Sequence, residues 1–447
     1  MKRLLGTAIA VTIALSLAGV ARAQDKLVVW WNKGFYEAED KAIQSAIAKW
    51  EPQSGTKVEL SLFSLEDIVT KTVSAVEAGN PPDLAFGWLF DFRTSSKWAF
   101  DGKLEDVSDV VTPLKSRYLP AAIDAVNLFN GKVGRRSIYA VPIEQQTDHF
   151  HYWLDLLKEA GFGEADVPRA WNEFWDFWCS KVQPAVRKKT GQRVYGIGLP
   201  ESTAATDTFY NFYMFLNAYH VDWIDENGKL RVDEPKIREG FIKSLGDYTK
   251  VFKSGCTPPG SVNWNDADNN NNFHNRTTIS TPNPSLSIPG KWLDDKNEDA
   301  YYNRIRTVEF PLGPDGKPVT NIVAVKQAII FADAKNKKAA KSFIGYLVQP
   351  ENLKPYIEGA LGRWYPVMPE LANTPFWTDP KDPHKSVAHK QYTQSDLLPF
   401  PAVFNWKVVL IQAENVWGRA IGRVVSENWT PEKAVDEMIA RIKELAS

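Results

Sequence analysis

Residues 263–273 read NWNDADNNNNF, a stretch that places one tryptophan and two aspartates among six asparagines. Each asparagine amide offers hydrogen-bond donors and an acceptor, and the tryptophan ring offers a flat apolar face. Together these groups can bind a ligand that has both hydroxyl groups and C–H faces, as a sugar has. A solvated loop or a helix cap is the alternative interpretation of an asparagine-rich run.

Cysteine, histidine and tyrosine side chains could support other chemistry. Cys179 and Cys256 can form a disulfide in an oxidising compartment, although the sequence leaves open whether their sulfur atoms meet. No histidine cluster accompanies them, so they do not indicate a zinc site. His149 and His151 alternate along a predicted strand, which favours a structural role. We therefore predict neither a metal site nor a cofactor.

The first 23 residues have the pattern of a secretory signal peptide. Lys2 and Arg3 precede the apolar residues 4–20, and the ARA sequence of residues 21–23 is a small-residue cleavage site. Glycine, serine and threonine interrupt the apolar stretch, and no cysteine follows it to accept a lipid, so a membrane span and a lipoprotein are both disfavoured. We expect a soluble mature chain, beginning at Gln24, in the periplasm.

Composition limits the partners of the mature chain. Residues 1–23 contain three basic and no acidic residues, so their removal leaves 50 basic and 54 acidic side chains and a net charge of −4. This charge argues against nucleic acid and anionic membranes as partners. All 17 tryptophans remain in the mature chain, and most of them should lie in its core. The length is sufficient for two or three domains.

Alternating strand and helix patterns precede the candidate site residues near the N-terminus. Residues 27–31, 57–63 and 81–88 have the composition of strands, and an amphipathic helix follows each of the first two. This order predicts a parallel sheet with helices on both faces and a ligand beyond the carboxyl ends of its strands. Those ends carry Trp31, Asn32, Trp88 and Asp91.

A tryptophan-rich helix is predicted over residues 168–182. Trp171, Phe174, Trp175 and Trp178 recur at positions i, i+3, i+4 and i+7, so they share one face. Such a stripe indicates packing against a core rather than a binding site.

Several segments, in this order, resemble the family 1 extracellular solute-binding proteins of bacterial ABC importers. The resemblance covers nearly all of the mature chain and rests on the number and order of its short motifs. These are GNPPDLAF (79–86), FDGKLEDVSDVV (100–111), IYAVP (138–142), YWLDLLKEAG (152–161), WNEFWDF (171–177), NRTTISTPN (275–283), FPLGPDG (310–316) and KNKKAAKSFIGYLV (335–348), together with the signal peptide and the helical C-terminus.

The resemblance implies an α/β, two-lobed periplasmic binding protein fold of type II. Each lobe would contain a mostly parallel sheet flanked by helices, with a hinge between the lobes and the ligand in the cleft. The N-terminal lobe would comprise residues 24–142 plus 302–347. The C-terminal lobe would comprise residues 143–301 plus 348–447.

The same resemblance implies where the ligand-binding residues lie. They would come from the strand ends, the hinge crossing, the asparagine-rich stretch and a loop that returns to the cleft. They are Trp31, Asn32, Trp88, Asp91, Glu144, Gln146, Trp264, Asp268, Asn270, Asn283, Arg363 and Trp364. Ser285 stands where the maltose-binding protein has a stacking tryptophan, so the identity of the sugar does not transfer.

The implied function is that of a monomeric periplasmic receptor that binds a mono- or oligosaccharide, without chemistry, and delivers it to an inner-membrane ABC permease. A polyamine or a phosphorylated solute such as glycerol phosphate is the alternative ligand. A secreted glycosidase would need two carboxylates about 5–9.5 Å apart across the scissile bond. Some relatives bind ferric iron through adjacent tyrosines, but Tyr301 and Tyr302 align with a lobe crossover rather than the cleft.

Overall fold

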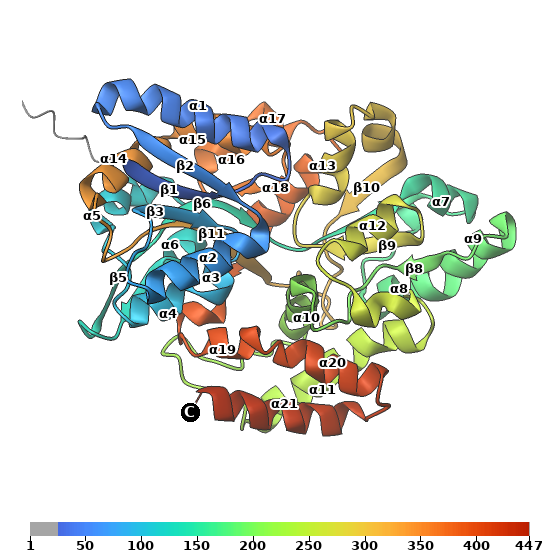
Figure 1. Ribbon diagram of the computed structural model, residues 1–447. Coiled ribbons are helices and arrows are strands. Elements are labelled where there is room, and N and C mark those ends of the chain that lie inside the picture. Colours follow the sequence, from blue (N-terminus) through green and yellow to red (C-terminus); the bar gives the residue numbers. More distant parts are fainter. Residues whose placement is uncertain (1–25, 447) are drawn as a thin grey trace, which may run out of the picture.

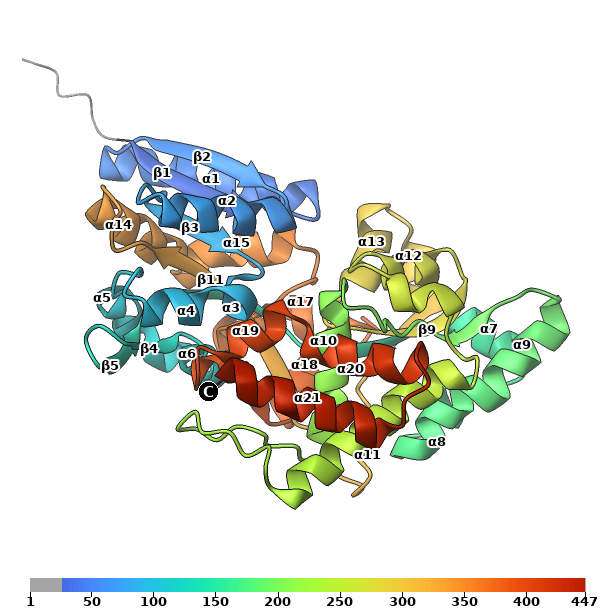
Figure 2. The same ribbon diagram turned by 60° about the horizontal axis from the view of Figure 1, so that its bottom comes forward.

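The computed structural model describes residues 26–446, and the predicted signal peptide lies outside this range. The chain forms two α/β lobes, each built on its own sheet and flanked by helices, so the predicted fold class is confirmed (Figure 1). Figure 2 shows the two lobes side by side, with the C-terminal helices lying across the molecule in front of them. No helix among the described residues is long and apolar enough to cross a membrane.

The sheet of the first lobe has the strand order β12-β6-β11-β3-β1-β2, and β13 pairs with β11 beside this path. β1 pairs in parallel with β2 and β3, whereas β11 runs antiparallel to β3 and β6. The strands are β1 (Leu27–Asn32), β2 (Val58–Phe63), β3 (Leu84–Gly87), β6 (Val141–Gln146), β11 (Asn321–Ile330), β12 (Tyr365–Pro366) and β13 (Leu397–Pro399). A separate hairpin joins β4 (Asn127–Asn130) to β5 (Arg135–Ile138).

The helices of the first lobe form where apolar residues recur at helical spacing. The first helix buries Ile43, Ala46, Ile47 and Trp50 on one face, as the sequence predicts. The helices are α1 (Glu37–Ser54), α2 (Leu65–Glu77), α3 (Phe90–Arg93), α4 (Ser95–Phe100), α5 (Ser108–Val111), α6 (Pro120–Asp124), α14 (Lys337–Leu347), α15 (Pro350–Gly359), α16 (Pro369–Ala372), α17 (Pro375–Thr378) and α18 (Lys385–Gln394).

The second lobe has a four-stranded sheet with the order β10-β7-β9-β8. Its strands are β7 (His149–Trp153), β8 (Tyr195–Ile197), β9 (Thr278–Asn283) and β10 (Ile305–Val308). β7 runs antiparallel to both of its neighbours, and only β8 pairs in parallel. The prediction of mostly parallel sheets is therefore wrong in detail, because several strands enter their sheet after crossing between lobes rather than through a β-α-β unit.

The helices of the second lobe bury most of its aromatic residues. They are α7 (Leu154–Glu159), α8 (Trp171–Asp176), α9 (Gln183–Thr190), α10 (Thr206–Ala218), α11 (Pro235–Lys253), α12 (Asp268–His274), α13 (Ser287–Asp294), α19 (Val408–Ala413), α20 (Val416–Val425) and α21 (Pro431–Ala446). A π-helical segment, Phe177–Val182, continues α8 into α9. The predicted stripe from Trp171 to Trp178 is buried in this core, which confirms its packing role. Cys179 and Cys256 form a disulfide.

The chain crosses between the lobes later than the predicted boundaries. β6 pairs with β11 as far as Gln146, so the first crossing follows it rather than Pro142. β10 belongs to the second sheet, which moves the second crossing beyond Val308. Residues 350–392 contribute to the first core through side chains such as Tyr356 and Tyr392, so the predicted boundary at residue 348 is wrong. The first crossing has only two residues between β6 and β7, so the sequence does not mark it, whereas the second is a proline- and glycine-rich segment between Val308 and Asn321.

Gln391 ties two of these crossings together. Its Nε2 atom donates hydrogen bonds to the Asp148 carbonyl oxygen at 2.8 Å and to Asn321 Oδ1 at 2.7 Å. Its Oε1 atom lies 2.9 Å from His149 Nδ1. All of these side chains are buried, so the hinge region is a connected polar network rather than a loose linker.

Candidate functional site

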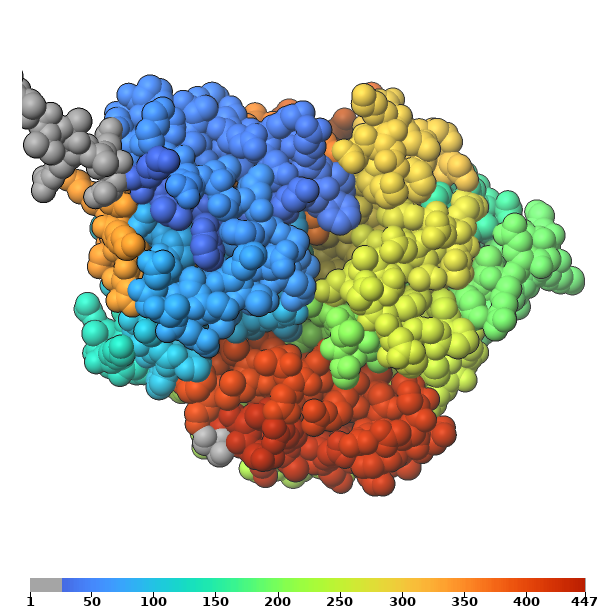
Figure 3. Space-filling model, in the orientation of Figure 1, coloured from blue at the N-terminus to red at the C-terminus, as the bar shows by residue number. Residues whose placement is uncertain are grey.

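A cavity of about 490 Å³ lies between the two lobes. Figure 3 shows the hollow between the N-terminal lobe and the segment around α12 and α13. Its walls come from the residues before α1, the ends of β3 and β6, β11, the loop after α15, and α10, α12 and α13. They are Phe35, Tyr36, Leu65, Trp88, Leu89, Gln146, Thr206, Asp207, Tyr210, Asp266, Ala267, Asn270, Asn271, His274, Asn283, Pro284, Ser285, Ser287, Lys291, Asp294, Lys326, Arg363 and Trp364.

Trp88 is fixed at the end of β3 by two hydrogen bonds. Its backbone N–H donates to Asn32 Oδ1 at 3.2 Å, and its indole Nε1 donates to Glu144 Oε1 at 2.9 Å. Its ring lies 5.0 Å from that of Trp364, between ring centroids. Asn32 and Glu144 are buried and do not line the cavity, so they hold the tryptophan in place.

Arg363 extends into the cavity between aromatic rings. Its guanidinium carbon lies 4.3 Å from the ring centroid of Phe35, 4.5 Å from that of Trp88 and 4.4 Å from that of Trp364. These distances are within the range of cation–π attraction. Trp88 and Trp364 are only 5% and 2% exposed, whereas Phe35 is 54% exposed. The two tryptophans therefore hold Arg363, and Phe35 presents the open ring surface.

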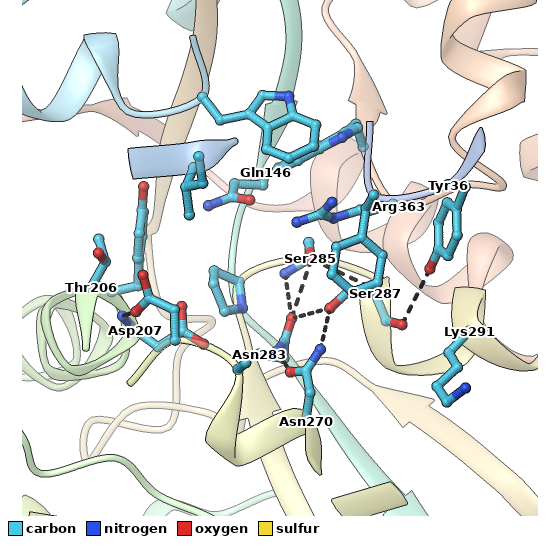
Figure 4. A pocket seen from close by; sticks show the side chains of 18 of the residues that line it. Tyr36, Gln146, Thr206, Asp207, Asn270, Asn283, Ser285, Ser287, Lys291 and Arg363 are labelled. Carbon is cyan, nitrogen blue, oxygen red and sulfur yellow. Dashed lines mark hydrogen bonds between the residues drawn. The ribbon is translucent and has the colours of Figure 1, made fainter. Parts of the chain in front are cut away.

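Amides and hydroxyl groups of the second lobe form a hydrogen-bonded group at the cavity wall (Figure 4). Asn283 Nδ2 donates to Asn270 Oδ1 at 2.6 Å, and Asn270 Nδ2 donates to Ser287 Oγ at 2.9 Å. The hydroxyls of Ser287 and Ser285 both donate to Asn283 Oδ1 at 3.2 Å. The end of β9 and the start of α12 and α13 meet here, so three elements fix these donors and acceptors.

Acidic side chains lie at the other end of the cavity, on and beside α10 (Figure 4). The Asp207 backbone N–H donates to Asp266 Oδ1 at 3.1 Å, and Asn269 Nδ2 donates to Asp207 Oδ2 at 3.0 Å. Burial, and then the neighbouring charge of Asp266, raise the pKa of Asp207 well above its ordinary value. The asparagine-rich stretch thus supplies both a support for Asp207 and a wall residue, Asn270.

A buried ion pair lies behind the cavity wall. Lys326 Nζ lies 3.7 Å from Asp91 Oδ2 and donates to the Trp88 carbonyl oxygen at 2.7 Å. Burial raises the pKa of Asp91 to about 6, and the positive charge of Lys326 opposes this shift. Burial lowers the pKa of Lys326, and Asp91 opposes that shift in turn. Asp91 does not line the cavity, so its role is to compensate Lys326, which does.

The structure brings together half of the residues that the sequence suggested. Trp88, Gln146, Asn270, Asn283, Arg363 and Trp364 line the cavity. Asn32, Asp91 and Glu144 lie directly behind it, as described above. The remaining three, Trp31, Trp264 and Asp268, do not reach it.

Trp31, Trp264 and Asp268 have local structural roles. Trp31 is buried against Phe86, with a distance of 4.3 Å between ring centroids, and donates to Tyr356 Oη at 3.0 Å. Trp264 is buried at the end of a 3-10 turn, Pro259–Asn263, outside the cavity lining. Asp268 begins α12 and accepts from the Asn265 backbone N–H at 2.7 Å. The predicted ligand contacts of these residues are corrected accordingly.

Several wall residues had no usable sequence signal. Asp207 and Tyr210 lie on α10, where nearly every residue is buried, so no polar face marks them. Lys326 lies within a strand whose ten residues are all buried. Phe35 and Tyr36 follow the end of β1 closely, and their position at a strand end could have indicated them.

The alternative metal residues lie outside the cavity. Tyr301 donates to Asp382 Oδ2 at 2.8 Å, and His151 Nδ1 lies 2.9 Å from Thr307 Oγ1. Within residues 26–446 there is no group of three or more histidine, cysteine, aspartate or glutamate residues arranged to hold a metal ion.

Comparison with solved structures finds the same fold in sugar-bound transport proteins. A solute-binding protein of an ABC transporter from Thermotoga lettingae TMO, bound to α-D-tagatose, has a TM-score of 0.72 at 20% identity, and the match covers 94% of this chain and 100% of that one. Maltose-bound MalE3 of T. maritima gives 0.72 at 20% identity, covering 94% and 99%. A sugar transporter protein from Arthrobacter chlorophenolicus A6 with bound laminaribiose gives 0.71 at 13%, covering 95% and 100%.

Sequence comparison gives the family. A search of curated proteins finds no match. The model of the bacterial extracellular solute-binding proteins matches residues 45–385, which is most of the chain. This protein is therefore a member of the bacterial extracellular solute-binding protein family.

Proposed function

We propose that this protein is the substrate-binding component of an ABC importer and binds a carbohydrate between its lobes. One observation carries the proposal: a single interlobe cavity combines an open aromatic ring with amides, hydroxyls and charged groups from both lobes. Its volume of about 490 Å³ lies within the range of about 300–1,000 Å³ typical of small-molecule sites.

The chemistry of the wall suits a sugar. The exposed face of Phe35 can cover the C–H groups of a pyranose ring, as aromatic rings do for other apolar surfaces. Asn270, Asn283, Ser285 and Ser287 offer both donors and acceptors, which hydroxyl groups of a sugar require. The three ligands named for the similar structures, tagatose, maltose and laminaribiose, support the carbohydrate class.

Closure of the lobes would couple binding to transport. Phe35 and Arg363 come from the first lobe, and Asn270 and Asn283 come from the second, so a ligand that contacts both groups stabilises the closed arrangement. The ligand shifts the equilibrium between open and closed conformations only to the extent that it binds the closed one more tightly. We propose that a monomer, exported to the periplasm after loss of residues 1–23, presents this closed state to a membrane permease and leaves the sugar unaltered.

A thermal-shift screen tests the proposal. We expect one class of mono- or oligosaccharide to raise the Tm, since a ligand that binds only the folded state stabilises it by RT ln(1 + [L]/Kd). Spermidine and glycerol phosphate belong in the same screen, and a rise with either of these alone would contradict the carbohydrate assignment. Chromatography of the recovered sugar checks for turnover, and hydrolysis would identify an enzyme instead.

A further inference from the structure

The guanidinium of Arg363 has no hydrogen-bond or ion-pair partner among residues 26–446. Its Nε and Nη1 atoms are buried without an acceptor, although the side chain lines the interlobe cavity. Phe35, Trp88 and Trp364 cover the guanidinium, so its orientation is fixed by three rings. Arg363 as a residue is partly exposed, but its Nε and Nη1 donors are buried without an anion, which is unfavourable and unusual for a purely structural arginine.

The acids that interact electrostatically with Arg363 do not pair with it directly. Glu39 uses Oε1 to accept the backbone N–H groups of Phe35 and Tyr36, both at 3.0 Å, and neither Glu39 nor Glu144 pairs with the guanidinium. Burial raises the pKa of Glu39 and raises that of Glu144 well above its ordinary value. The charge of Arg363 opposes both pKa shifts, but this attraction acts without a direct hydrogen bond or ion pair to the guanidinium.

The other cations of the cavity wall already have partners. Lys326 pairs with Asp91, and Lys291 Nζ donates to Asp295 Oδ2 at 2.6 Å. The acids of the wall, Asp207, Asp266 and Asp294, form no ion pair with Arg363 within the described chain. A negatively charged group of a ligand in the cavity would therefore find its hydrogen-bond donors at Arg363.

We propose that the bound carbohydrate carries a carboxylate, as a uronic acid does, and that Arg363 binds this group. This inference rests on the proposed carbohydrate-binding function. A guanidinium presents parallel N–H groups that match the two oxygens of a carboxylate, and this bidentate pairing is preferred by arginine. The sugar ring would then lie beside the open face of Phe35, with its hydroxyls toward the amides of Asn270 and Asn283.

A carboxylate fits better than a phosphate. Arg363 is one cation whose buried donors have no direct partner, and a single carboxylate can accept from them. A phosphate monoester carries nearly two negative charges at neutral pH and would need a second free cation, but both lysines of the wall are paired.

Matched ligands test the charge of the sugar. Calorimetric titrations compare D-galacturonate with D-galactose, with the methyl ester of galacturonic acid, and with glucose 6-phosphate. We expect the wild type to bind the free acid at least about tenfold more tightly than the neutral partner of each pair, in line with charge-assisted hydrogen bonding. Esterification keeps the size of the ligand nearly constant and removes only its charge and one acceptor.

Variants of Arg363 test the anchor. Arg363→Gln is expected to lower affinity for the acidic sugar about 10- to 100-fold and to change that for the neutral sugar little. Arg363→Lys keeps the charge without the paired N–H groups, so its loss is expected to be smaller. Arg117→Gln removes an arginine of the first lobe that pairs with Glu370 and does not line the cavity, so it serves as the control that keeps the preference for the acid. The Tm of each ligand-free variant monitors folding.

Four outcomes would overturn the inference. They are equal or tighter binding of the neutral sugars, equal losses for both sugars in Arg363→Gln, tighter binding of glucose 6-phosphate, and loss of the preference in Arg117→Gln. In each of these cases a carbohydrate still binds, so the proposed function survives. If no acidic or neutral carbohydrate binds, both the inference about Arg363 and the proposed carbohydrate-binding function are contradicted.

Discussion

Phe35 offers the largest open ring surface on the cavity wall, because the neighbouring tryptophans are covered. At 54% exposure it leaves about 100 Å² available, and burying this area against a sugar contributes up to about 2 kcal/mol. We predict that Phe35→Ala weakens carbohydrate binding by up to about 30-fold in calorimetry, with a Tm close to that of the wild type.

Phe129 provides the matched control for this prediction. It is also an exposed phenylalanine, but it lies on the β4–β5 hairpin and does not line the interlobe cavity. Phe129→Ala should leave the affinity unchanged. If Phe35→Ala binds the sugar as tightly as Phe129→Ala does, stacking on Phe35 is excluded.

Individual site residues were predictable from the sequence where a strand end or an unusual local composition marked them. Trp88 follows a strand whose carboxyl end borders the cavity, and Asn270 belongs to the asparagine-rich stretch. Trp31 also ends a strand, yet its ring turns into the core because successive strand side chains point to opposite faces. Asp207 and Lys326 are buried polar residues whose surroundings depend on the whole fold, so no local pattern marks them.

Helix α13 approaches the start of α1 across the cavity through Gly290. A Cβ atom at this position would lie 2.5 Å from Tyr36 Oη, and Tyr36 donates to the Ser287 carbonyl oxygen at 3.4 Å. We predict that Gly290→Ala disfavours this close approach of the lobes and lowers ligand affinity about tenfold. Its Tm should not fall, since alanine is the better helix former.

Gly422 in α20 is the control for Gly290. It is also a helical glycine, and nothing lies within 4 Å of a Cβ built there. Gly422→Ala should therefore keep the wild-type affinity. Equal affinities for the two variants would show that the Tyr36 contact does not limit closure.

The disulfide joins two elements of the second lobe that are 77 residues apart in sequence. Cross-linking restricts the unfolded chain, and a loop of this length corresponds to at most about 4.5 kcal/mol of stabilisation in the chain-entropy model. We predict that Cys179→Ala combined with Cys256→Ala lowers the free energy of unfolding by about 2–4 kcal/mol in denaturant titrations. A reductant should destabilise the wild type and leave the double variant unchanged. A reductant-insensitive wild type would contradict the prediction.

Elements were predictable where their apolar periodicity was strong. The stripe from Trp171 to Trp178 and the buried face of α1 follow from helical spacing alone. Strand direction was not predictable in the same way, because β7 and β11 are defined by which distant strands they meet. The asparagine run forms a helix although asparagine is a poor helix former, because Asn269 and Asn270 bond to Asp207 and Ser287 outside the run.

The stability of the whole molecule should depend on pH through its buried histidines. Burial lowers the pKa of His149 to about 4, and hydrogen bonding to Gln391 opposes the shift only in part. Below about pH 6.5 the unfolded chain binds a proton that the folded chain does not. The free energy of unfolding therefore falls as the pH drops from about 6.5 to about 4, by up to about 3 kcal/mol for this residue.

Buried carboxyls also make stability depend on pH. Burial raises the pKa of Asp148, so its contribution to stability changes with pH in the opposite direction to that of His149. Comparison with a variant of His149 separates the two contributions. The Tm of the wild type and of His149→Gln should diverge at pH 7 and converge toward pH 4.5. Phe129→Ala, which changes no titratable group, should keep the shape of the wild-type curve. Parallel curves for wild type and His149→Gln would exclude His149 as the titrating group.

The two-lobed architecture was predictable from the order of motifs, but its division was not. The first core takes side chains from Leu27 to Val403, with the whole second sheet inserted between β6 and β11. Motif order shows that two lobes exist. The positions at which the chain crosses depend on strand pairings such as Ile305 with Trp153, which join residues far apart in sequence.

The position of β13 has a consequence for how the protein is made. A ribosome completes all four strands of the second sheet by residue 308, but the first sheet lacks its final strands until residue 399 has been synthesised. Of the two sheets, the one whose first strands are translated earliest is therefore completed last. Until β11 has been synthesised, β3 and β6 lack the strand that joins them, which suits the proposed export of the chain before it acquires its final shape.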